Sequence, residues 1–136
     1  MAEIIYPTIE RIVEYNFLAI MIIKVKKADQ AKVISKPRLE YILEECKKTQ
    51  GDIYDKATVL FINIIRLHPF ASGNRRTAFL MAKEFLLTNN AKFKIQDDPS
   101  QAKIMIGIRE GYYTPEEVKE WLKNGKIKEF NRFKKE

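Results

Sequence analysis

Apolar residues recur at intervals of three and four along most of the chain, the spacing that places side chains on one face of an α-helix. One such stripe follows Pro7-Thr8, and another follows Ser35-Lys36-Pro37, where Ser35 is a candidate helix cap. Further helices are expected over residues 74–90, after Asp97-Asp98-Pro99-Ser100, and after Thr114-Pro115-Glu116-Glu117, which reads as a capping box. The pattern therefore predicts a chain built mainly from helices.

One of these helices is expected over the segment from about Asp52 to Leu67. Its run Val59-Leu60-Phe61-Ile62-Asn63-Ile64-Ile65 is apolar on most sides, so we expect this helix to be central and the most buried. Residues 18–34 leave two alternatives open, a small β-hairpin or a continuation of the first helix. The basic segment from Lys123 forms either a last helix or a frayed tail.

These elements predict the fold class all-α: a compact helical bundle around one buried central helix, with a small β-hairpin flap as the open alternative. The length of 136 residues suits one domain, which we place at residues 1–136. No apolar stretch approaches the about 20 residues that cross a bilayer. No secretory leader is evident, and we therefore expect a cytoplasmic protein without a membrane partner.

The net charge bears on the kind of partner, and the cysteine content bears on disulfide bonds. A net charge of +7 favours an anionic partner such as a nucleotide, a nucleic acid or an acidic protein surface. A solvated, lysine-rich surface accounts for the same charge equally well. Cys46 is the only cysteine, which excludes an intrachain disulfide, and its position in a helical stripe indicates a small packed side chain.

The chemistry of the chain is concentrated in the stretch His68-Pro69-Phe70-Ala71-Ser72-Gly73-Asn74-Arg75-Arg76-Thr77, which contains its only histidine. A histidine suits proton transfer near neutral pH, although His68 could instead cap the preceding helix. Gly73 permits a turn whose backbone N–H groups can hold a phosphate. Asn74 can cap the next helix or donate to a phosphate oxygen, and Phe70 is expected to point inward as structural support.

Two arginines follow this turn. Arg76 falls in the first turn of the next helix, where a cation opposes the helix dipole, so we expect an anionic ligand beside it. Arg75 either shares that role or points to solvent. Together these residues predict a phosphate-binding loop with a proton acceptor at its entrance.

The stretch resembles the signature of the Fic/DOC family, His-Pro-Phe-x-Asp/Glu-Gly-Asn-Gly/Lys-Arg. The resemblance extends to Tyr6-Pro7-Thr8, to the helix ending Leu87-Thr88-Asn89-Asn90, and to Glu117-Val118-Lys119-Glu120-Trp121-Leu122, which are similar to Doc-type, death-on-curing proteins. It implies an all-helical fold with a short β-hairpin flap, here residues 21–34, that lines up a target protein.

The resemblance also implies an activity. His68 would be the base that activates a serine, threonine or tyrosine hydroxyl of a target protein, Gly73 and Asn74 would cradle the phosphates of ATP, and Arg76 would clamp them. Most Fic members transfer AMP, whereas Doc-type members transfer a phosphoryl group. Arg75 and Phe79 replace a glycine and a second arginine of Fic members and favour the Doc side. Doc-like function would make the protein a toxin, and because no inhibitory Ser/Thr-x-x-x-Glu-Gly/Asn stretch is found, restraint would come from a partner antitoxin.

Ser72 departs from the family pattern, because it stands where the family has the acidic ligand of magnesium. A hydroxyl can ligate Mg²⁺ but usually does so beside a carboxylate, so weakened metal binding is expected. This departure leaves an alternative function, a catalytically impaired relative that binds a nucleotide or a protein. The net positive charge also allows a third function, binding of nucleic acid. The sequence contains no recognised nucleic-acid-binding motif, which disfavours this function.

Overall fold

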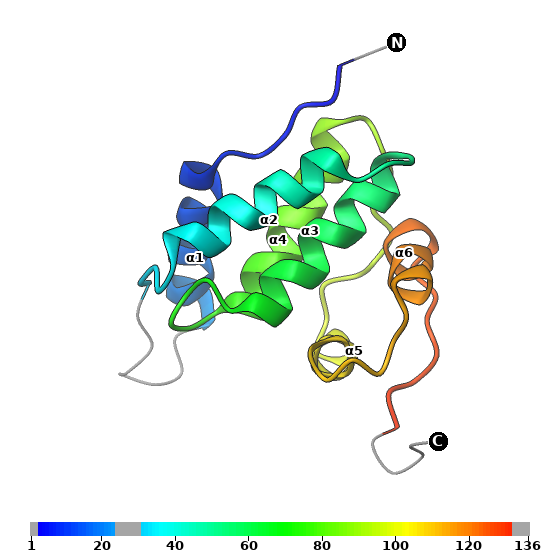
Figure 1. Ribbon diagram of the computed structural model, residues 1–136. Helices are drawn as coiled ribbons and strands as arrows, with labels where there is room; N and C mark the ends of the chain where they lie inside the picture. Colours follow the sequence, from blue (N-terminus) through cyan, green and yellow to red (C-terminus); the bar gives the residue numbers. More distant parts are fainter. Residues whose placement is uncertain (1–2, 24–30, 132–136) are drawn as a thin grey trace.

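The computed structural model describes residues 3–23 and 31–131 (Figure 1). Their helices are α1 (Ile9–Ile23), α2 (Lys36–Lys48), α3 (Ile53–Leu67), α4 (Asn74–Thr88), α5 (Ser100–Arg109) and α6 (Pro115–Asn124). The described residues form no sheet, and an isolated antiparallel bridge joins Val33 to Phe70. The all-α prediction is confirmed.

Helix α3 is the centre of the bundle, as its apolar sequence predicts. It contacts α2, α4, α5 and α6, and Figure 1 shows these helices arranged around it. Its residues Leu60, Phe61, Ile64 and Ile65 are fully buried. Phe61 packs against Trp121 of α6 with a ring-centroid distance of 5.9 Å. Because full burial of such side chains stabilises a fold by roughly 1.5–3 kcal/mol each, α3 supplies a large share of the core.

Local capping residues set where several helices begin. The Ser35 hydroxyl accepts a hydrogen bond from the backbone N–H of Arg38, with Pro37 in the first turn of α2. Thr114 and Glu117 form the predicted capping box at the start of α6. Asp52 caps α3 by accepting from the N–H groups of Tyr54 and Asp55 at 3.0 Å each. These caps satisfy N–H groups that have no partner inside the helix.

The segment predicted as either hairpin or helix is helical in its first part. Helix α1 continues through Ile23, so residues 21–23 belong to a helix and not to a flap. Residues 24–30 of the predicted flap lie outside the described residues. Residues 31–35 run antiparallel to the His68 loop, where Ala71 N–H donates to the Lys32 carbonyl at 2.9 Å and Ile34 N–H donates to the Pro69 carbonyl at 2.8 Å.

The segment after α6 follows neither alternative in its described part. Residues 125–131 form no further helix, yet Phe130 is buried and the Tyr113 hydroxyl donates to the Lys128 carbonyl at 2.9 Å. The segment is therefore packed rather than frayed up to Asn131. Across the described parts of the chain, no helix combines the length and apolarity needed to cross a membrane.

Candidate functional site

His68 lies where the central helix ends. It is the C-cap of α3 and adopts the left-handed conformation, with φ of 48° and ψ of 62°. This conformation costs a residue with a Cβ atom roughly 1–2 kcal/mol, so the neighbouring contacts have to hold it. One of them is Arg38 of α2, whose guanidinium donates to the His68 carbonyl at 3.3 Å. The side chain of His68 is exposed at the surface of this fixed turn.

Asn74 closes the loop that follows. Its Oδ1 accepts from the Phe70 N–H at 3.0 Å, and its Nδ2 donates to the Phe70 carbonyl at 2.8 Å. The same Nδ2 lies 3.3 Å from Nδ1 of His68. Gly73, with φ of 76°, occupies the N-cap of α4, and no side chain caps that helix. The capping alternative for Asn74 is therefore wrong, because its amide turns back to the loop while Phe70 packs in the core.

Asn16 of α1 fixes the other side of the loop. It is 1% exposed, and its Nδ2 donates to the Ser72 carbonyl at 2.9 Å and to the Thr77 hydroxyl at 3.1 Å. A Cβ atom on Gly73 would lie 2.9 Å from Ile20 Cδ1, so α1 packs directly against the turn. Asn16 is not among the site residues predicted from the sequence. Its signal is a polar residue four positions after Ile12, on the face of α1 that is otherwise apolar.

Arg76 has an anionic partner within the chain. Its Nη1 and Nη2 donate to the two carboxylate oxygens of Asp97 at 2.6 Å each. The Arg76 side chain is 22% exposed and that of Asp97 is 45% exposed. The ion pair lowers the pKa of the Asp97 carboxyl and raises the pKa of Arg76. The cation at the start of α4 is thus compensated by Asp97, a residue that was not among the predicted site residues.

Residues 22–86 match the model of the Fic/DOC family, and this range contains the whole loop from His68 to Thr77. The matched part of the chain, residues 22–86, belongs to the Fic/DOC family. No curated protein matches the sequence. The family resemblance drawn from the loop motif is therefore confirmed, and the site is a Fic-type loop built between α3 and α4.

Ser72 occupies the position at which the resemblance to the Fic/DOC family implies an acidic ligand of magnesium. The family's magnesium needs oxygen ligands, with carboxylates preferred. Among residues 3–23 and 31–131 no group of three or more His, Cys, Asp or Glu side chains could hold a metal ion. The Asn74 side-chain oxygen already accepts from Phe70. The loop side chains therefore do not fit a magnesium ion held by the protein alone.

Arg75 extends the positive charge of the Fic/DOC loop toward α5. Partial burial lowers the pKa of its guanidinium, and the nearby charge of Arg109 lowers it further. Arg75 is of intermediate exposure, so both alternatives for it, a share in anion binding and a side chain that points to solvent, stay open. The charges of Arg75 and Arg109 and the N-terminus of α4 give this side of the loop a positive potential. Such a potential favours an anionic ligand.

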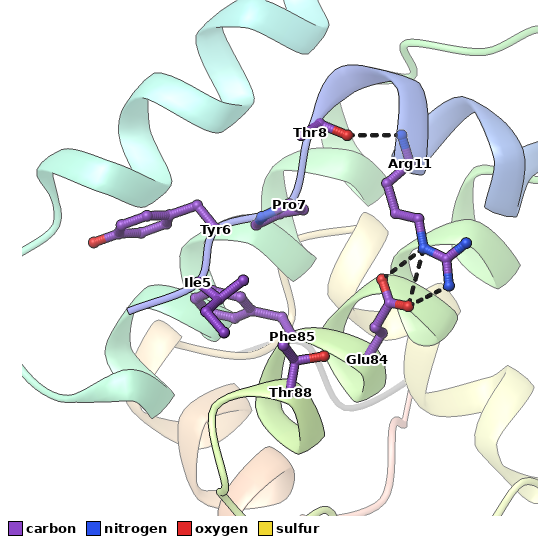
Figure 2. Close-up of a pocket in the computed structure, with 8 residues that line it drawn as sticks. All are labelled: Ile5, Tyr6, Pro7, Thr8, Arg11, Glu84, Phe85 and Thr88. Carbon is purple, nitrogen blue, oxygen red and sulfur yellow. Dashed lines mark hydrogen bonds and ion pairs between the residues drawn. The ribbon is translucent and has the colours of Figure 1, made fainter. Parts of the chain in front are cut away.

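A cavity of about 280 Å³ lies between the N-terminal segment and the end of α4. Figure 2 shows Arg11 of α1 pointing across it to Glu84 of α4, with hydrogen bonds of 3.0 and 3.1 Å from Nε. Glu84 is eight residues beyond Arg76, or about 12 Å along the helix axis. None of the residues that line this cavity belongs to the Fic/DOC loop, and its charged groups are paired with each other.

A larger cavity of about 620 Å³ lies between α5, α6 and residues 127–130. Trp121 and Ile104 contribute apolar walls, and Lys103 and Glu129 contribute charge. The cavity begins at Pro99, two residues after Asp97, and its size is typical of small-molecule pockets.

Proposed function

We propose that this Fic/DOC protein is a nucleotide-dependent transferase that modifies a hydroxyl group of a target protein. One observation carries the proposal: a single rigid loop joins an imidazole to a cationic helix start. Asn74 contacts the His68 ring at 3.3 Å and is also the first residue of the helix that carries Arg75 and Arg76. A proton-transfer group and an anion-binding helix terminus are thus held within one turn of chain.

In the proposed reaction, the oxygen of a target serine, threonine or tyrosine attacks a phosphorus atom of ATP. The hydroxyl proton passes to the imidazole of His68, and the bond from that phosphorus to the leaving phosphate oxygen breaks. Transfer of the γ-phosphoryl group releases ADP, and transfer of AMP releases pyrophosphate. Arg75, Arg76 and the N–H groups around Gly73 would stabilise the charge that develops on the phosphate oxygens.

We place phosphoryl transfer, the Doc-like reaction, ahead of AMP transfer. Phe79 replaces the second arginine of Fic members, is buried, and lies under the Arg76 guanidinium at 5.7 Å from its ring centroid. The extra cation of the loop is instead Arg75, one residue before Arg76. Under this proposal the protein acts as a toxin restrained by an antitoxin, with ATP as co-substrate and with weak dependence on Mg²⁺.

A second candidate function is supported by two observations. Ser72 offers no carboxylate at the position implied for the metal ligand, and Asp97 already occupies both terminal nitrogens of the Arg76 guanidinium. Both features are compatible with a catalytically silent module that binds a nucleotide or a protein.

ATP labelled at either the α- or the γ-phosphate separates these functions. The full chain is incubated with each label and cell extract, with Mg²⁺ or Mn²⁺ present. Label from the γ position on protein is the expected result, and label from the α position would indicate AMP transfer. Label from neither position would leave the silent binding module as the function.

A further inference from the structure

The Arg76–Asp97 ion pair uses the same groups that a phosphate would use. A guanidinium binds carboxylates and phosphates through two parallel N–H···O bonds, and both such bonds of Arg76 are made to Asp97 at 2.6 Å. The Nε atom of Arg76 is buried and has no hydrogen-bond partner within the described residues. The guanidinium is therefore fixed in place, with its fork directed at Asp97.

The position of Arg76 makes it an anion site whether or not Asp97 is present. It lies in the first turn of α4, where the N–H groups and the helix dipole already favour negative charge. Arg75, beside Arg109, adds further positive charge to the same helix start. One carboxylate compensates only part of this charge, and a nucleotide phosphate carries more negative charge than one carboxylate.

We propose that Asp97 is an internal competitor for the anionic ligand of Arg76, so that a nucleotide phosphate binds Arg76 only after the Asp97 carboxylate leaves it. This inference rests on the proposed function and adds a restraint built into the same site. Asp97 would thereby set the nucleotide affinity of the free protein.

The location of Asp97 suits a displaceable partner. It lies between α4 and α5, in a segment without regular structure, and nearly half of its side chain is exposed. Solvent partly screens the pair on the Asp97 side, and a multiply charged phosphate offers the same bidentate acceptor geometry with more negative charge, so it can compete for the Arg76 guanidinium. The neighbouring Asp98 is held differently, because its carboxylate accepts from the backbone N–H and the hydroxyl of Ser100 at the start of α5.

Asp98 therefore provides a matched control for a binding experiment. ATP binding to the full chain is measured by calorimetry for the wild type, Asp97→Asn and Asp98→Asn. Each variant loses one negative charge, but only Asp97→Asn removes the ion pair with Arg76. We expect a Kd about three- to tenfold lower for Asp97→Asn. Asp98→Asn should bind as the wild type does, because asparagine keeps the acceptor for Ser100.

Three other outcomes of these experiments would overturn the inference. Equal affinities for Asp97→Asn and Asp98→Asn, or weaker binding by Asp97→Asn, would overturn the competition while leaving the proposed function standing. Absence of ATP binding by all three proteins would overturn both. A crystal of the wild type soaked with ATP gives a test that does not depend on a variant. Phosphate on Arg76 with Asp97 beyond hydrogen-bond distance is expected, and bound ATP with the ion pair intact would overturn the inference.

Discussion

The side-chain amide of Asn74 presents its nitrogen, and not its oxygen, to the ring of His68. The backbone of Phe70 fixes this orientation, because its N–H needs the amide oxygen and its carbonyl needs the amide nitrogen. An NH₂ group only donates, so at 3.3 Å it can bond Nδ1 of neutral His68 only if Nδ1 carries no proton. The neutral ring then holds its proton on Nε2.

We therefore predict that free His68 is the Nε2-protonated tautomer. The chain has one histidine, so a ¹⁵N spectrum of the imidazole ring reports on His68 alone. Asn74→Asp replaces the donor by an acceptor and should move the proton to Nδ1. An unchanged tautomer in Asn74→Asp would contradict the assignment. If the prediction holds, His68 can accept a hydroxyl proton at Nε2 only after its own proton has moved to Nδ1, and this shift requires the Asn74 contact to Nδ1 to open.

A second prediction concerns the buried link between α1 and the loop. Asn16→Leu keeps a similar volume but leaves the Ser72 carbonyl without this donor, and it also removes the bond to Thr77. We expect a loss of about 1–3 kcal/mol in the free energy of unfolding, measured by urea titration. Phe17→Leu is the control on the same helix, since Phe17 is 54% exposed and should change stability by less than about 0.5 kcal/mol. Equal effects of the two variants would show that Asn16 does not hold the loop.

The third prediction follows from the neutral residue at the metal position. Ser72→Asp supplies a carboxylate beside the phosphate-binding turn, so ATP binding should become stronger when Mg²⁺ is added. Ser72→Asn, which adds similar bulk without charge, should respond to Mg²⁺ as weakly as the wild type. Calorimetric titrations with and without Mg²⁺ give the comparison. A wild type with the same Mg²⁺ dependence as Ser72→Asp would show that residue 72 does not limit metal binding.

Cys46 gives a prediction about chemical reactivity. Burial raises the pKa of its thiol to about 11, and the side chain is fully buried between helices. Since the thiolate is the reactive form, alkylation by iodoacetamide at pH 8 should be slow in the folded protein and fast in urea. Mass spectrometry follows the labelling. Rapid labelling without denaturant would mean that α2 opens locally around Cys46.

The features that the sequence predicts well are local ones. Ser35 with Pro37, and Thr114 with Glu117, identify helix starts because a cap involves residues at most a few positions apart. The apolar run of α3 predicts its central place for the same reason: burial on most sides requires apolar residues on most sides. The loop motif likewise lies within ten consecutive residues, and it identifies the family.

The contacts that sequence reasoning missed join residues far apart in the chain. Asn16 reaches Ser72 and Thr77 across separations of 56 and 61 residues, and Arg76 reaches Asp97 across 21. Such pairs depend on how helices pack, which no local pattern records. The cation at the start of α4 predicts an anionic group beside it, and we expected that group to be a ligand. The sequence could not show that Asp97 supplies one within the chain.

The most direct test of the proposed transferase is the transfer of label from γ-labelled ATP to protein by the wild type and by His68→Ala. His68 is exposed, so its truncation should leave the fold intact, which thermal unfolding checks. We expect labelled protein with the wild type and a loss of at least about a hundredfold with His68→Ala, the usual contribution of a positioned proton-transfer group. Equal labelling by both proteins would contradict a catalytic role for His68 and, with it, the proposed transferase function.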